Sequence, residues 1–193
     1  LRAIDRWLPG YLRSVAQRPA PRAGTRHLVF CLADHFEPLR GGVSPDAALA
    51  AVQEWTVNYR ELARGFRDAD GRPPRHTFFY PAEEFDPGCL RLLAELTAEG
   101  LAEVEIHLHH RHDTPEGLKS KLMQFRDRLR SEQGLLGSDA TGAVRYGFVH
   151  GNWALCNSRP DGDWCGVDAE LGILSETGCY ADFTFPSAPS PTQ

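Results

Sequence analysis

The sequence lacks long apolar runs and clusters of basic residues, and each absence excludes a class of protein. No apolar run approaches the roughly 20 residues that are needed to cross a bilayer, so we expect no membrane span. Lys and Arg are scattered along a chain of net charge −5, which indicates no surface for nucleic acid or an anionic membrane. The first fourteen residues carry arginines and a proline where a signal peptide would be apolar, although a signal preceding Leu1 would leave no trace.

Paired cysteines are also missing. The five cysteines are odd in number, widely spaced and without a Cys-x-x-Cys pair. This pattern indicates neither a disulfide framework nor a thiolate zinc site, and it favours a reducing, cytoplasmic location.

The length of 193 residues suits one domain. Residues 1–26 predict a short amphipathic helix followed by a linker rich in Pro, Gly and Arg, and residues 27–193 predict the ordered domain. A Pro-rich end directly follows the last expected strand, so we expect later elements of the fold to be absent from this sequence.

Apolar strand patterns alternate with helical patterns along the domain. The expected strands cover residues 27–33, 76–81, 102–109, 144–151 and 179–186. The expected helices cover residues 44–66, 86–100, 114–134 and 167–178, with Ser44 and Thr114 as N-caps before a proline. This alternation predicts an α/β fold with a parallel sheet, either open and doubly wound or closed as a (β/α) barrel.

Polar side chains collect where these strands end. They are Asp34, His35 and Glu37 after the first strand, Tyr80, Glu83 and Glu84 after the second, His107, His109, His110, His112 and Asp113 after the third, His150, Asn152 and Trp153 after the fourth, and Asp182 on the fifth. The carboxyl ends of parallel strands meet at one edge of the sheet, which is where chemistry is expected.

The third strand gives the most detail. Because side chains alternate between faces, Glu105, His107 and His109 share one face, which is costly unless something binds there. Two imidazoles and a carboxylate are a ligand set for a catalytic zinc or similar ion. A single histidine at a strand end is more often hydrogen-bonded or solvated than a ligand, and we expect His110 and His112 to face elsewhere.

Two further readings stay open at the other strand ends. Glu83 and Glu84 suit the N-terminus of the following helix as well as a site. Tyr80 and Trp153 suit packing as well as a platform for the apolar face of a sugar ring.

Five stretches together resemble one family, the polysaccharide deacetylases of the NodB-homology type. "LADH" (32–35) falls where the family has T-F-D-D, and "HTFFYP" (76–81) is similar to its second strand. "EIHLHHRHD" (105–113) aligns with E-I-G-N-H-T-x-x-H. "GFVHGNWAL" (147–155) and "ELGILSETGCYADFTFP" (170–186) resemble the segments that follow, so that the likeness covers about residues 27–186.

The resemblance implies a distorted (β/α) barrel with seven or eight strands, which this chain would leave incomplete at its C-terminal end. It implies a hydrolase that removes acetyl groups from a sugar or polysaccharide by attack of a metal-activated water. His35, His109 and Asp113 would hold a divalent ion, in the first place zinc, with His107 as a nearby alternative ligand. Asp34 would be the catalytic base.

The remaining roles follow from where the sequence departs from the family. His35 replaces the metal-binding Asp and Asp113 replaces the second His, while Val149 stands where the family has an arginine. The last motif, with its general-acid histidine, has no counterpart before Gln193. Either the chain is a fragment of a longer protein, or another histidine such as His107 or His150 takes that role. The carbohydrate would be held by four residues at the strand ends, namely Tyr80, Glu83, Asn152 and Trp153.

Two alternatives remain beside this hypothesis. The first is a related barrel hydrolase that acts on a non-sugar amide. The second is a non-catalytic domain that binds glycan or metal through a degenerate site, which the missing arginine and histidine favour.

Overall fold

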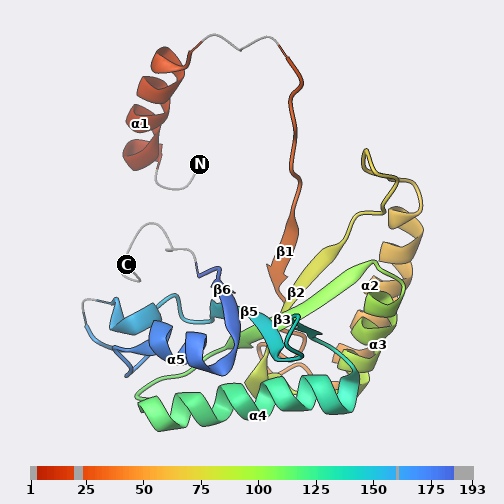
Figure 1. The fold of residues 1–193 in the computed structure, drawn as a ribbon, viewed down its shortest axis with the longest axis vertical. Helices are drawn as coiled ribbons and strands as arrows, with labels where there is room; N and C mark the ends of the chain where they lie inside the picture. The colour runs from red at the N-terminus through yellow and green to blue at the C-terminus, as the bar shows by residue number, and fades with distance from the viewer. Residues whose placement is uncertain (1–3, 20–23, 160, 185–193) are drawn as a thin grey trace.

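The computed structural model describes residues 4–19, 24–159 and 161–184 (Figure 1). In these residues the strands form one mixed sheet with the order β1-β2-β3-β5-β4, and β6 also pairs with β5. The strands are β1 (Leu32–His35), β2 (His76–Pro81), β3 (Ala102–Leu108), β4 (Gly137–Ser138), β5 (Val144–His150) and β6 (Cys179–Asp182).

The sheet is mostly parallel. All neighbouring pairs among β1, β2, β3, β5 and β6 are parallel, and only the short β4 runs antiparallel to β5. The predicted α/β class with a parallel sheet is therefore confirmed. Within the described residues β1 and β6 do not pair with each other, so the sheet is not closed.

The helices begin and end close to the predicted positions because their caps are encoded locally. They are α1 (Ile4–Gln17), α2 (Pro45–Ala63), α3 (Pro87–Ala98), α4 (Pro115–Gln133) and α5 (Glu170–Thr177), with 3-10 turns η1 (Ala82–Glu84) and η2 (Leu155–Asn157). The Ser44 hydroxyl accepts the amide of Ala47, and the Thr114 hydroxyl accepts that of Gly117. Each of these caps precedes a proline at the first helical turn.

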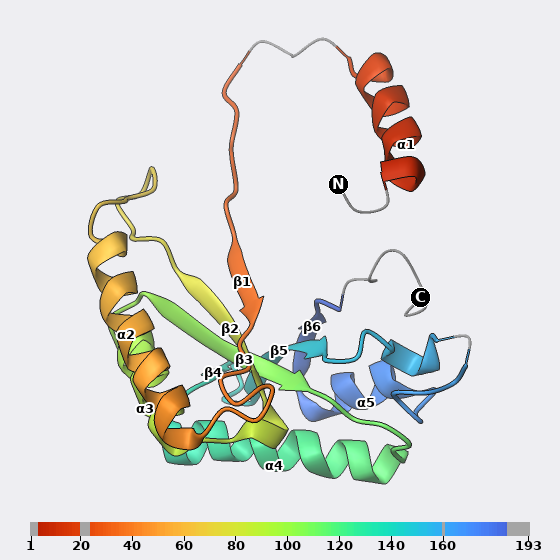
Figure 2. The ribbon, with the colours of Figure 1, turned by 180° about the vertical axis from the view of Figure 1, so that it is seen from behind.

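Helices α2 to α5 lie along one side of the sheet (Figures 1 and 2). The core of the protein lies on that side, where strand side chains such as Phe78, Ile106 and Phe148 are fully enclosed. We call this side the helix face and the opposite side the inner face. The register between strands places His35, Phe79 and Glu105 in one row on the inner face.

The predicted first strand is wrong in its limits. Residues 27–33 were expected to form a strand that is buried on both faces, but β1 covers Leu32–His35. Leu28, Val29 and Phe30 are between 76% and 93% exposed. The reason is that β2 begins at His76, which pairs with Leu32, so the preceding residues run past the end of their neighbour.

Helix α1 lies apart from the sheet in both views (Figures 1 and 2). None of its residues is buried, although it has an apolar side with Trp7, Tyr11 and Leu12. No helix within the described residues is long and apolar enough to span a membrane.

Candidate functional site

Three side chains from two strand ends meet on the inner face at the carboxyl edge of the sheet. We call His35, Glu37 and His107 the edge cluster. Each offers one ligand atom, and these atoms all lie within 4.8 Å of one another. Glu37 Oε1 lies 3.2 Å from His107 Nε2 and 4.0 Å from His35 Nδ1.

The hydrogen bonding of His107 defines which of its nitrogens can bind a cation. Its Nδ1 lies 3.0 Å from the carbonyl oxygen of Val149. A carbonyl only accepts, so Nδ1 carries the proton, and burial together with the neighbouring His35 lowers the pKa of His107 to about 3. The Nε2 lone pair then faces a carboxylate oxygen of Glu37. A cation between these two acceptors would turn a repulsive contact into ligation, so the residues fit a metal ion.

His109 and Glu83 extend the edge cluster. His109 Nε2 lies 3.5 Å from Glu37 Oε1, and its Nδ1 is hydrogen-bonded to the Glu83 carboxylate. Burial alone would lower the pKa of His109, but the hydrogen bond and charge of Glu83, together with Glu37, outweigh it and raise that pKa. Gly151 allows this placement, because a Cβ there would lie 2.3 Å from the His109 ring.

The edge cluster is open to solvent on one side. The side chains of His35 and His109 are about 30% exposed, whereas His107 is fully buried behind them. The ring of Trp153 is centred 5.6 Å from that of His35 and borders the open side. A metal held here would therefore keep a position for water or substrate, as catalytic sites require.

Glu105 shares the inner face but is satisfied by protein groups. Its carboxylate accepts hydrogen bonds from the Gly147 amide and, at 3.0 Å, from the Tyr180 hydroxyl. Burial nevertheless raises the pKa of Glu105 to about 7. The polar row on β3 is thus only partly explained by a metal, since Glu105 has its own partners.

A second group lies on the helix face, beneath the loop that leads into α5. We call it the buried cluster, and it consists of His110, His150, Cys165 and Glu170. Its four ligand atoms lie within 4.8 Å of one another, so the protein has a buried cluster that is able to hold a metal ion. His150 pairs with Leu108, so these two side chains share a face of the sheet. His107 is the residue before Leu108, and its side chain therefore lies on the opposite face. The two clusters are thus on opposite faces at the strand ends.

Glu170 is the centre of the buried cluster. One carboxylate oxygen lies 3.1 Å from His110 Nε2 and 3.8 Å from His150 Nε2. The other lies 3.3 Å from Cys165 Sγ and accepts the Cys156 amide at 2.8 Å.

Burial and the neighbouring groups set the protonation states in the buried cluster. Burial lowers the pKa of His150 to about 4 and raises that of the Cys165 thiol to about 11. Burial opposes the ionisation of Glu170, but the hydrogen bond from His110 and the charges around it bring its pKa below the usual value. In the absence of a cation, the cluster therefore holds one carboxylate beside a neutral imidazole and a thiol.

No family model matches this sequence. A search of curated proteins and a search of solved structures likewise give no match. What the clusters do must therefore be argued from their geometry.

The predicted metal ligands separate into two places. His35 and His107 lie together, and His109 adjoins them through Glu37. Asp113 belongs to neither cluster, because its carboxylate binds Lys121 at 2.8 Å and faces His110 at 3.4 Å. The predicted set of His35, His109 and Asp113 is therefore not assembled. The carboxylate beside the histidines is Glu37.

The two predicted catalytic residues lie on the helix face. Asp34 precedes His35 on a strand, so its side chain turns to the other side, where it contacts His76 at 3.3 Å. His150 is enclosed in the buried cluster, where its Nδ1 accepts the Asn152 amide at 3.1 Å. Neither residue reaches the edge cluster by these contacts.

The predicted sugar-binding residues also divide. Trp153 and Glu83 border the edge cluster. Tyr80 is fully buried and donates its hydroxyl proton to the Glu84 carbonyl oxygen, which excludes a role in contacting substrate. The side-chain amide of Asn152 donates to the carbonyl oxygens of His110 and Trp164, so this residue joins two loops.

Sequence reasoning missed four residues of these clusters. The sequence pattern gives Glu37 no role beyond a polar strand end and predicts that His110 faces elsewhere. Cys165 carries no signal, because a cysteine without a Cys-x-x-Cys spacing indicates no metal site. A single glutamate within a helical pattern, such as Glu170, indicates none either. Only the placement of the loop between η2 and α5 brings them to the strand ends.

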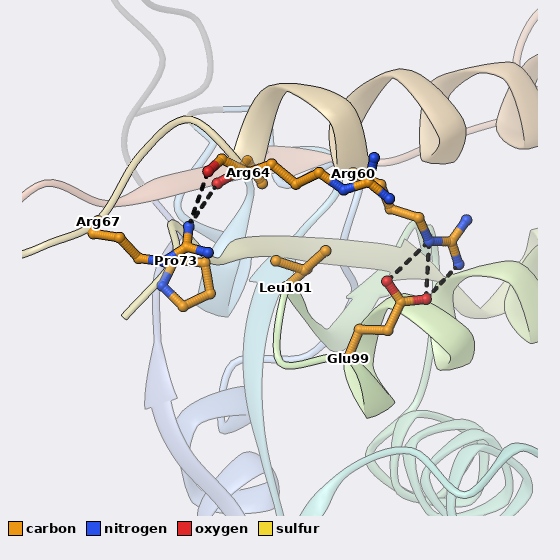
Figure 3. A pocket seen from close by; sticks show the side chains of 7 residues that line it. Arg60, Arg64, Arg67, Pro73, Glu99 and Leu101 are labelled. Carbon is orange, nitrogen blue, oxygen red and sulfur yellow. Dashed lines mark hydrogen bonds and ion pairs between the residues drawn. The ribbon is translucent and has the colours of Figure 1, made fainter. Parts of the chain in front are cut away.

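The hollow in Figure 3 is separate from both clusters. It has a volume of about 230 Å³ and lies between the ends of α2 and α3, where Arg60 binds Glu99. Its lining residues precede the starts of β2 and β3, so it is at the amino edge of the sheet.

Proposed function

We propose that the chain is a metal-dependent hydrolase of the polysaccharide deacetylase type, which removes acetyl groups from a sugar or polysaccharide. The observation that carries the proposal is the edge cluster, where the lone pair of His107 faces the Glu37 carboxylate at 3.2 Å and His35 completes the set. In this proposal the open parallel sheet is part of a distorted (β/α) barrel.

His35, Glu37 and His107 would hold the divalent ion, with zinc the first choice for two imidazoles and one carboxylate. When bound, the ion would polarise the acyl carbonyl and lower the pKa of a bound water. His107 is held in the required tautomer by the Val149 carbonyl oxygen.

The other residues of the site have roles that follow from where they lie. His109 presents Nε2 to the edge cluster while Glu83 holds Nδ1, so this pair is placed to give a proton to the leaving group. Trp153 offers an aromatic surface beside His35 on the open side, which suits the apolar face of a sugar ring.

The test is acetate release from acetylated chitooligosaccharides and acetylated polysaccharide by zinc-loaded protein. We expect zinc-dependent release, and a loss of about a thousandfold in His107→Ala, because the ligand set would be broken. Glu103→Gln is the control, since Glu103 binds Arg75 on the surface of the same strand. Equal release by the wild type and His107→Ala would contradict the proposal. Zinc binding without release from any acylated sugar would support a non-catalytic binding domain instead.

A further inference from the structure

The buried cluster joins four segments that are distant in the sequence. His110 follows β3, His150 ends β5, Cys165 comes from the loop after η2, and Glu170 begins α5. Their side chains have no measurable exposure, or close to none. Four groups of this kind converge without any role in the proposed hydrolysis.

We propose that the buried cluster is a structural zinc site, separate from the edge cluster. Two imidazole nitrogens, one sulfur and one carboxylate oxygen complete a four-coordinate shell for zinc and leave no position open for water. Cys165 and Glu170 as anions balance the charge of Zn²⁺, which makes burial of the ion acceptable.

An unpartnered nitrogen supports the site independently of the ligand count. His150 Nε2 is buried and has no hydrogen-bond partner, and the nearest carboxylate oxygen, from Glu170, is 3.8 Å away. A buried polar atom without a partner is costly. Ligation of the ion by this nitrogen would remove that cost.

A second carboxylate lies beside His110. While its Nε2 is hydrogen-bonded to Glu170, its Nδ1 lies 3.4 Å from Asp113 Oδ2 without a hydrogen bond. Lys121 binds the same oxygen at 2.8 Å. An outer carboxylate that receives the second ring proton is the usual support of a zinc-binding histidine. Asp113 would take that part once His110 Nε2 binds the ion.

Proton movements accompany binding and can be followed. Ligation by Cys165 would release the thiol proton to solvent. Ligation through Nε2 would leave the ring proton of each histidine on Nδ1, where that of His110 would face Asp113. At His150 the backbone amide of Asn152, which donates to Nδ1, would have to turn away.

The site would fix the loop that borders the edge cluster. Trp153 lies between His150 and Cys165 in the chain, and its ring reaches His35 on the other face. Zinc in the buried cluster would therefore hold the aromatic side of the edge cluster in place.

Cobalt titration of the full chain distinguishes the two clusters, because only the buried cluster contains a cysteine. We expect one equivalent of Co²⁺ to give a sulfur-to-cobalt charge-transfer band in wild type and in Glu37→Gln, which disables the edge cluster. Cys165→Ser should lose the band, and Cys156→Ser, from the same loop, should keep it. Asp113→Asn should weaken cobalt binding about 10- to 100-fold while retaining the band.

X-ray absorption on zinc-loaded Glu37→Gln keeps the proposal testable if Cys165→Ser does not fold. We expect one sulfur and three nitrogen or oxygen neighbours around the zinc. A first shell without sulfur, a band that persists in Cys165→Ser, or no bound metal in Glu37→Gln would overturn the proposal. None of these outcomes bears on acetate release at the edge cluster.

Discussion

The edge cluster and the buried cluster use similar side chains, but they differ in access to solvent. Both contain two histidines and a glutamate near the carboxyl edge of the sheet. His35 in the edge cluster is 31% exposed, whereas the histidines and glutamate of the buried cluster are fully enclosed. An ion with an open position can bind and activate water, while an enclosed one can only hold segments together.

The faces of the sheet cause this difference. One residue step along β3 moves a side chain from the inner face to the helix face. The helix face is covered by α2 to α5 (Figure 1). On the inner face, the side chains of His35 and His109 are about 30% exposed at the carboxyl edge, beside Trp153. The following predictions test whether chemistry belongs to the open cluster and stability to the enclosed one.

The largest effect on stability is expected for Glu170→Ala, measured by urea unfolding in the presence of a chelator. The change leaves the buried histidines and the Cys156 amide without their acceptor, so we expect a loss of about 3–5 kcal/mol. Glu83→Ala is the matched control, because it also removes a carboxylate from a histidine but at a site that is 37% exposed. It should cost about 1 kcal/mol or less. If both variants lost the same free energy of unfolding, the buried cluster would contribute no more to stability than the edge cluster.

The pH dependence of stability should change in Glu105→Gln. The pKa of Glu105 is raised to about 7 in the folded state, above the value of 4.5 expected in the unfolded chain. The stability of the wild type is therefore unaffected by Glu105 below pH 4.5 and falls as the pH rises toward 7. Because the variant does not titrate at this position, its free energy of unfolding should rise by about 2 kcal/mol relative to that of the wild type between pH 5 and pH 8. Urea unfolding at both pH values measures this change.

Glu103→Gln serves as the control for this experiment. It removes one carboxylate from the exposed side of the same strand, where Glu103 pairs with Arg75. The difference in the free energy of unfolding between Glu103→Gln and wild type should be the same at pH 5 and at pH 8. A constant difference for Glu105→Gln as well would show that Glu105 is not the titrating group.

A smaller effect is expected for Trp153→Ala. If the ring supports a sugar beside His35, KM should rise about tenfold while kcat changes little, as steady-state kinetics would measure. Trp164→Ala is the control, because Trp164 lies in the same loop as Trp153 but packs against Arg111. Its side chain is 38% exposed. A fall in kcat alone would assign Trp153 to loop structure instead.

The smallest effect is expected for Arg60→Ala, at the opposite edge of the sheet. Arg60 binds Glu99 beside the hollow of Figure 3, where the pair is partly exposed. The free energy of unfolding should fall by about 0.5–1 kcal/mol and acetate release should not change. A loss of activity would move the functional site to the amino edge.

Local signals predicted the α/β class and the starts of two helices. The N-caps Ser44 and Thr114 act within three residues of their own position, so the sequence alone located those helices. The limits of β1 could not be found in this way. They depend on where β2 begins, and an apolar run such as residues 28–30 does not reveal whether a neighbour lies beside it.

The candidate site was only partly predictable. Strand alternation correctly placed His107 on the inner face, and the same rule would have excluded Asp34, which the family resemblance assigned as base. Cys165 and Glu170 depend on the path of a long loop, for which the sequence has no periodic pattern. Asp113 precedes α4, and its carboxylate binds Lys121 of that helix and faces His110 instead of the edge cluster.

Acetate release by zinc-loaded Glu37→Gln and Glu170→Gln, measured side by side at a temperature where both are folded, tests the central claim most directly. We expect Glu37→Gln to lose about a thousandfold in kcat/KM, because the edge cluster would lose its only anionic ligand. Glu170→Gln should retain activity within about tenfold, because its effect reaches the site only through the loop. Wild-type activity in Glu37→Gln, with loss in Glu170→Gln, would contradict the account and assign the chemistry to the buried cluster.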